Sequence, residues 1–204
     1  MTGDDRTPVL VGVAQATERD ARSEPAPEPI AMLERVARDA GEDAGAGSHL
    51  LRSLDTIGIV NVLGWRAPNP AAFLAERMGA KPTRTILTGT GGESPLVLLA
   101  HAAAEIEAGR SRAALLAGCN TLRTALRARR AGRRLGWATG PESPPFALSG
   151  HKGGSSELEN LYGLSSPPVV YPLFENALRA RRGLSLEAHC RAMGRLMSRM
   201  SAVA

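Results

Sequence analysis

The chain alternates short apolar runs with longer amphipathic segments. Four runs predict buried strands, over residues 9–13, 57–63, 85–88 and 113–117. Between them, apolar residues recur at helical spacing over residues 30–40, 71–78 and 95–108. Because strands and helices follow each other in a β-α-β-α-β-α-β order, we expect an α/β fold: a mostly parallel or mixed sheet with helices on both faces.

The predicted helices begin and end at residues that favour helix termini. Asn69 before Pro70 predicts an N-cap followed by proline in the first turn, and Gly79 predicts the end of that helix. Ser94 before a proline repeats the signature, so we expect Ser94 to cap the helix over 95–108. Gly41 is expected to end the first helix.

The pattern changes after Leu122. Six arginines fall within residues 123–134, on a predicted helix, and residues 136–168 are rich in Gly, Ser and Pro. Two more helices are predicted over 172–182 and 186–200, the second capped by Ser185. We therefore expect an α/β domain over residues 1–135 and a second domain over 136–204, partly helical and partly irregular.

Composition and charge narrow the function classes. A net charge of +5 over 204 residues favours small anionic molecules or nucleic acid. The arginine run is expected to be a solvated or interface helix, since it lacks the interleaved aromatic residues typical of nucleic-acid binding. Two cysteines do not form a disulfide framework, which predicts a reducing, cytoplasmic setting. The acidic N-terminus does not resemble a signal peptide, and no apolar run reaches about 18 residues, so we expect no membrane association.

Residues 100–120, AHAAAEIEAGRSRAALLAGCN, resemble the helix that follows the nucleophile of thiolases and the strand beyond it. The opening VLVGVAQ is similar to the first strand of that family, and YPLFENALRARRGLSLEAHCRAMGRLM to the connecting segment of sterol-carrier-type thiolases. The resemblance is to acetyl-CoA acetyltransferase homologues of lipid metabolism. It implies an αβαβα core of two similar halves, acyl-CoA as substrate, coenzyme A as co-product, no covalently bound cofactor, and usually a dimer.

The sequence departs from the thiolase pattern at its nucleophile. Counting back from Ile106 and Gly109 places the family's cysteine at Gly92, and Pro95 stands where the family has glycine. The family's later histidine and second cysteine, which lie in its C-terminal half, have no counterpart in these residues. The resemblance therefore implies the N-terminal thiolase half, completed by a homo-oligomer or by a complementary C-terminal half.

Three turn residues are candidates for the chemistry that remains. Gly92 offers only its backbone, as a donor to a thioester carbonyl at the positive end of the helix. Glu93 is either a general base or a first-turn carboxylate favoured by the helix dipole. Ser94 is either a replacement nucleophile or the cap. His151 and Lys152, in a glycine-rich basic loop, are candidates for contact with a coenzyme A phosphate.

Other polar residues are expected to be structural. Cys119 is predicted to be a small buried residue. His189 and Cys190 are adjacent and so lie on different helical faces, which argues against a metal site. His101 and Glu105 are four residues apart and are expected to pair.

Three functions stay open. One is an acyl-CoA-handling acetyltransferase homologue that has lost the covalent thiolase step. Another is a non-catalytic acyl-CoA-binding subunit that needs a second chain. The third, a nucleotide-dependent oxidoreductase, is disfavoured because the glycine turn does not complete the GxGxxG fingerprint and follows the third predicted strand.

Overall fold

The computed structural model describes residues 6–18, 27–148 and 155–203. The chain divides into two compact units, Met1–His151 and Lys152–Ala204. The first contains α1 (Pro29–Asp43), α2 (Gly47–Arg52), β1 (Thr56–Ile59), α3 (Pro70–Met78), β2 (Arg84–Thr88), α4 (Ser94–Glu107), β3 (Ala114–Ala117), α5 (Leu122–Arg130) and β4 (Phe146–Leu148). The second contains α6 (Glu157–Leu161), α7 (Pro167–Arg181) and α8 (Leu186–Val203).

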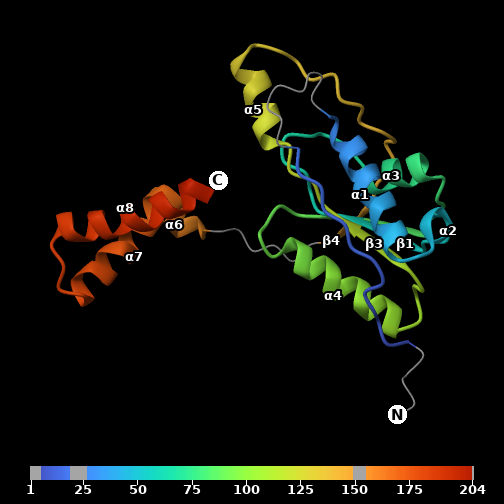
Figure 1. The fold of residues 1–204 in the computed structure, drawn as a ribbon, viewed down its shortest axis with the longest axis horizontal. Helices are drawn as coiled ribbons and strands as arrows, with labels where there is room; N and C mark the ends of the chain where they lie inside the picture. The colour runs from blue at the N-terminus through green and yellow to red at the C-terminus, as the bar shows by residue number, and fades with distance from the viewer. Residues whose placement is uncertain (1–5, 19–26, 149–154, 204) are drawn as a thin grey trace. The chain divides into compact units, whose positions relative to one another are not determined.

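The first unit is an α/β structure built on a four-stranded sheet. The strand order is β3-β1-β2-β4, and each neighbouring pair is parallel. Helices α1 and α3 lie against one face of the sheet and α4 against the other (Figure 1). The predicted fold class, an α/β sheet with helices on both faces, is confirmed.

Alternation along β1 separates the two faces of the core. Ile57 and Ile59 are fully buried and belong to the apolar cluster that α1 and α3 contribute to. Gly58 points the other way, where Leu98 of α4 lies so close that an added Cβ would approach its Cδ1 to 2.7 Å. The parallel register places Ile86 of β2 and Leu116 of β3 on either side of Gly58, so Leu98 lies over the one position of this row that has no side chain.

Capping explains where α3 begins and ends. The Asn69 side chain accepts a hydrogen bond from the Ala72 N–H at 2.9 Å, and Pro70 occupies the first turn. Gly79 ends the helix in the left-handed conformation, with φ of 69°. Both predictions for this helix are confirmed, because each rests on a local rule.

The predicted first strand, residues 9–13, is wrong. Val9 and Leu10 are 74% and 79% exposed, and the segment joins no sheet in the part of the chain that the structure describes. It runs beside α1 instead: the Val13 N–H donates to the Asp43 carboxylate at 2.8 Å, and Gly12 lies against the Ala40 carbonyl. An apolar run indicates a preference for burial but does not specify the strand that would pair with it.

Several predicted boundaries also change. Helix α1 does not end at Gly41 but continues to Asp43. Helix α5 ends at Arg130, because Gly132 adopts φ of 64°. Helix α7, predicted to begin at Pro172, begins at Pro167 and contains Pro172. Residues 146–148, predicted to be irregular, form β4 on the edge of the sheet. A short edge strand pairs through its backbone, so its side-chain pattern gives little indication that it is a strand.

The second unit is helical. Ser185 caps α8 as predicted, accepting from the Ala188 N–H at 3.2 Å. His189 is the one buried residue among those described in this unit, and its Nε2 lies 2.7 Å from a Glu175 carboxylate oxygen on α7. Across the described ranges, no helix combines the length and apolarity needed to cross a membrane.

Candidate active site at the carboxyl edge of the sheet

Loops after three parallel strands meet at one edge of the sheet. Because β1, β2 and β3 run in the same direction, the segments that follow them all emerge at the carboxyl edge, where open α/β sheets bind ligands. The Asn61 side-chain amide, after β1, donates to the Thr90 hydroxyl at 2.8 Å in the turn after β2. Gly118, after β3, lies beside Val60. These contacts assemble one surface from three loops.

The turn between β2 and α4 is held by hydrogen bonds to its own carbonyls. The hydroxyls of Thr88 and Ser94 both donate to the Gly89 carbonyl, at 2.9 and 3.0 Å. The Ser94 N–H donates to the Gly91 carbonyl at 3.2 Å. The side chain of Ser94 is therefore turned inward, and Ser94 is only 4% exposed.

The cap of α4 differs from the prediction by one residue. Glu93 is the N-cap and Ser94 is the first helical residue. Ser94 makes its hydrogen bond backward to Gly89, which closes the turn instead of capping a later N–H. Glu93 is exposed, and its carbonyl accepts from the N–H groups of Leu96 and Val97 at 3.0 Å each.

Gly92 lies directly before this cap, at the leading end of α4. It is exposed, and an added Cβ would have no atom within 4 Å. The backbone of the turn is thus open on the side where a cysteine side chain would project. Gly92 therefore lies next to the positive end of the helix.

The other residues singled out in the sequence do not belong to the glycine turn. His151 and Lys152 lie outside the described residues. Cys119 is half-buried, with its Sγ 3.9 Å from the Met32 Sδ, and burial raises the pKa of its thiol. Sequence reasoning missed Asn61; its only signal is a polar residue just after a buried strand.

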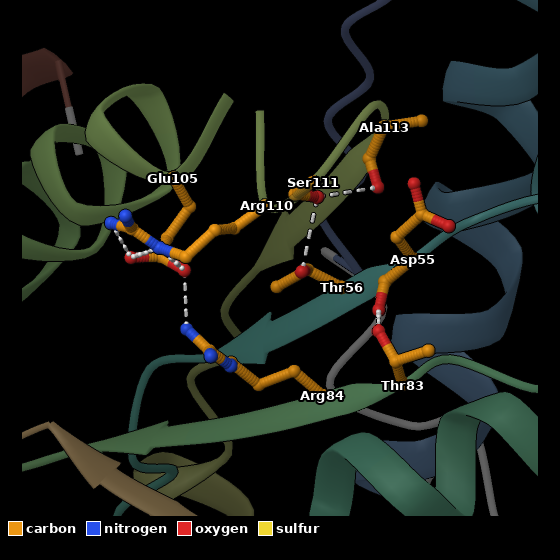
Figure 2. A network of polar contacts seen from close by, with 8 residues as sticks. All are labelled: Asp55, Thr56, Thr83, Arg84, Glu105, Arg110, Ser111 and Ala113. Atoms are coloured by element: carbon orange, nitrogen blue, oxygen red, sulfur yellow. Dashed lines mark hydrogen bonds and ion pairs between the residues drawn. The ribbon is translucent and has the colours of Figure 1, made fainter. Parts of the chain in front are cut away.

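Glu105 does not pair with His101. It accepts hydrogen bonds from Arg84 and Arg110, with its Oε2 2.5 Å from Arg84 and its Oε1 2.6 Å from Arg110 (Figure 2). The hydrogen bonds from Arg110 and the charge of Arg84 lower the pKa of Glu105 to about 2. The His101 ring stacks on Phe146 instead, with centroids 5.7 Å apart. Since Arg84 begins β2, this network lies at the amino edge, away from the glycine turn, and is structural.

Comparison with solved structures gives the fold a name. A crystal structure of a monomeric SCP2-thiolase-like protein type 1 from Mycobacterium smegmatis matches 95% of this chain at 30% identity, with a TM-score of 0.63. The chain has a thiolase-like fold. It spans about a third (34%) of the length of the mycobacterial protein. A scan against protein-family models and a search of curated proteins found no match.

The likeness extends to both units of this thiolase-like chain, since the match covers nearly all of its residues. The resemblance seen in residues 100–120 falls on the second half of α4 and on β3, which are elements of the sheet unit. Within the described ranges, no group of three His, Cys, Asp or Glu side chains is placed to hold a metal ion.

Proposed function

We propose that this thiolase-like chain binds acyl-CoA thioesters at its glycine turn and does not form a cysteine-linked acyl-enzyme. The observation that carries the proposal is the position of Gly92, at the leading end of α4 and on the carboxyl edge of the sheet. The thiolase-like fold supports acyl-CoA as the ligand class. The exposed backbone at Gly92 supports close approach of a carbonyl group.

Covalent acyl transfer needs an activated nucleophile at this point. Glycine has none. The Ser94 hydroxyl is buried and donates to Gly89, so its proton is not directed at a base. The Cys119 thiol belongs to the neighbouring loop, and burial raises its pKa, which disfavours the reactive thiolate.

The turn retains a means of binding a carbonyl oxygen. The N–H groups of Gly92 and Glu93 precede the helix, and the helix dipole favours partial negative charge there. The Ser94 N–H is excluded because it already donates to Gly91. We therefore assign the thioester carbonyl to the backbone N–H of Gly92, with Asn61 supporting the turn through Thr90.

Calorimetry and intact-mass measurement test this proposal together. We expect acetyl-CoA to bind saturably and to leave the protein mass unchanged after prolonged incubation. Gly92→Asp places a carboxylate in the open space before α4. The carboxylate competes for the same N–H groups and repels a carbonyl oxygen, so the variant should bind acetyl-CoA about tenfold or more weakly.

Gly194→Asp is the matched control, since Gly194 lies in α8 and its added Cβ also meets no atom within 4 Å. It should bind acetyl-CoA as the wild type does. A covalent acetyl adduct, absence of binding to the wild type, or equal losses in the two variants would each contradict the proposal.

A second candidate, an acyl-CoA-binding subunit that pairs with another chain, is favoured by the outer face of α4. Leu96 and Leu99 are 69% and 51% exposed on a helix whose inner side is buried against the sheet. Apolar side chains in such positions favour association. We expect the double variant Leu96→Lys and Leu99→Lys to reduce self-association in sedimentation velocity; a wild-type chain that stays monomeric at all concentrations would contradict pairing between copies.

A further inference from the structure

Asn61 follows β1 at the carboxyl edge of the sheet, on a well-anchored stretch of backbone. The preceding N–H, that of Val60, donates to the Ala117 carbonyl at 2.9 Å, and the following residue, Val62, is buried. The backbone N–H of Asn61 itself donates to the Thr88 hydroxyl at 3.4 Å. The Asn61 side chain is exposed, so a ligand at this edge can contact it.

The glycine turn orients the Asn61 side chain. Its amide group donates to the Thr90 hydroxyl at 2.8 Å. Asn61 is therefore joined to the turn at two points, Thr88 and Thr90, on either side of Gly89. A side chain that is already held in one orientation loses less conformational entropy when it binds a ligand.

The side-chain oxygen of Asn61 is an unused acceptor. Among the described residues, none donates a hydrogen bond to it. Asn120, at the same edge after β3, differs because its side-chain oxygen accepts from the first N–H of α5 at 3.1 Å. The carbonyls of Gly89 and Gly91 are also occupied, by the hydroxyl and the N–H of Ser94. Asn61 thus offers an acceptor that its neighbours do not.

The Thr90 hydroxyl adds a donor beside this acceptor. It accepts from Asn61 and still has its own proton to donate, and no residue in the described ranges accepts that proton. A donor and an acceptor side by side match a hydroxyl group on a ligand, because a hydroxyl both donates and accepts. A ketone could use only the donor, and a methylene group neither.

This pair lies close to the proposed position of the thioester carbonyl. Thr90 is two residues before Gly92, and two extended residues span at most about 7 Å. An oxygen on the third carbon of an acyl chain is three covalent bonds from the thioester carbon. A thioester whose carbonyl oxygen accepts from the Gly92 N–H therefore has its third carbon within reach of Asn61 and Thr90.

We infer that the glycine turn selects thioesters whose acyl chain carries a hydroxyl group on the third carbon. That hydroxyl donates to the Asn61 side-chain oxygen and accepts from the Thr90 hydroxyl. Asn61 determines the specificity, since it supplies the acceptor that a ketone or a methylene group cannot use. The inference rests on the proposed function and adds the class of acyl group to it.

Calorimetry on the full chain with three four-carbon thioesters tests the inference. Butyryl-CoA, acetoacetyl-CoA and 3-hydroxybutyryl-CoA, the last as each of its enantiomers, share coenzyme A and chain length and differ at the third carbon. We expect one enantiomer of 3-hydroxybutyryl-CoA to bind about fivefold more tightly than butyryl-CoA, which corresponds to one net hydrogen bond. Acetoacetyl-CoA should bind less tightly than that enantiomer.

Three variants assign this preference to a single oxygen atom. Asn61→Ala should abolish the preference for the hydroxyl group. Asn61→Asp keeps an acceptor oxygen and can accept from the Thr90 hydroxyl, so it should retain the preference. Asn120→Ala is the matched control, because the oxygen that it removes is already bonded within the chain, and it should also retain the preference.

The ratio of affinities separates recognition from a structural role. If Asn61 only supported the turn, Asn61→Ala would weaken all three thioesters by the same factor, and this result would overturn the inference. Equal affinities of the wild type for the three thioesters, or loss of the preference in Asn120→Ala, would overturn it too and leave the glycine-turn proposal standing. Absence of binding of all three to the wild type would contradict the glycine-turn proposal itself.

Discussion

The contact between Gly58 and Leu98 positions α4, and with it the glycine turn. Gly58→Ala would place a Cβ 2.7, 3.2 and 3.3 Å from three side-chain atoms of Leu98, which is 1% exposed. Because Leu98 Cγ is among them, rotation about the end of the side chain does not relieve the overlap. Overpacking of this kind costs about 1–3 kcal/mol of unfolding free energy.

The reverse substitution tests the same contact. Leu98→Ala alone removes a fully buried side chain and should cost about 2–5 kcal/mol. In the double variant the added methyl group at position 58 occupies part of the space that Leu98 leaves. We therefore expect the double variant to be more stable than the sum of the single effects predicts, by about 0.5–3 kcal/mol.

Urea unfolding followed by tryptophan fluorescence measures this coupling. Trp65 and Trp137 both belong to the sheet unit, so the signal reports that unit. Gly136→Ala is the control, since its added Cβ meets no atom within 4 Å, and it should stay within about 0.5 kcal/mol of the wild type. Additive effects of the two single substitutions would refute the claim that α4 rests on Gly58.

Two further predictions concern stability. Ionised Glu105 stabilises the fold above its ordinary pKa of 4.5, and this contribution is lost as the pH falls toward about 2. The Glu105→Gln variant should therefore have a lower melting temperature than the wild type at about pH 7 and the same melting temperature near pH 2. A difference in melting temperature that does not change with pH would contradict the charge pairing. Asn69 is 1% exposed, and Asn69→Ala removes two hydrogen bonds: the one that caps α3 and the one from the Asn69 amide to the Thr85 hydroxyl. The variant should lower the unfolding free energy by about 1–2 kcal/mol in urea titrations. An unchanged midpoint would mean that neither hydrogen bond contributes to stability.

Local rules in the sequence account for much of the sheet unit. Asn69, Pro70 and Gly79 bound α3 as expected because a cap depends on residues within one turn. The glycine turn lies between β2 and α4, in agreement with the strand and the helix predicted over residues 85–88 and 95–108. These features require no knowledge of what packs against them.

Features that depend on distant partners were not predictable. Glu105 pairs with Arg84 and Arg110 instead of His101, because β2 brings Arg84 to the end of α4. Residues 9–13 have the composition of a buried strand but lie exposed beside α1. The helix predicted over residues 123–134 ends at Arg130, because Gly132 adopts φ of 64° and Arg133 and Arg134 follow that turn.

The central claim is that an acyl-CoA thioester binds where Gly92 meets the leading end of α4. Alkylation of the Gly92→Cys variant by iodoacetamide, with and without acetyl-CoA, tests it most directly. A thiol at this exposed helix terminus should react faster than Cys119 and Cys190, because the helix N-terminus lowers its pKa, and acetyl-CoA should slow that reaction alone. A rate no greater than that of Cys190, or one that acetyl-CoA does not change, would contradict the account.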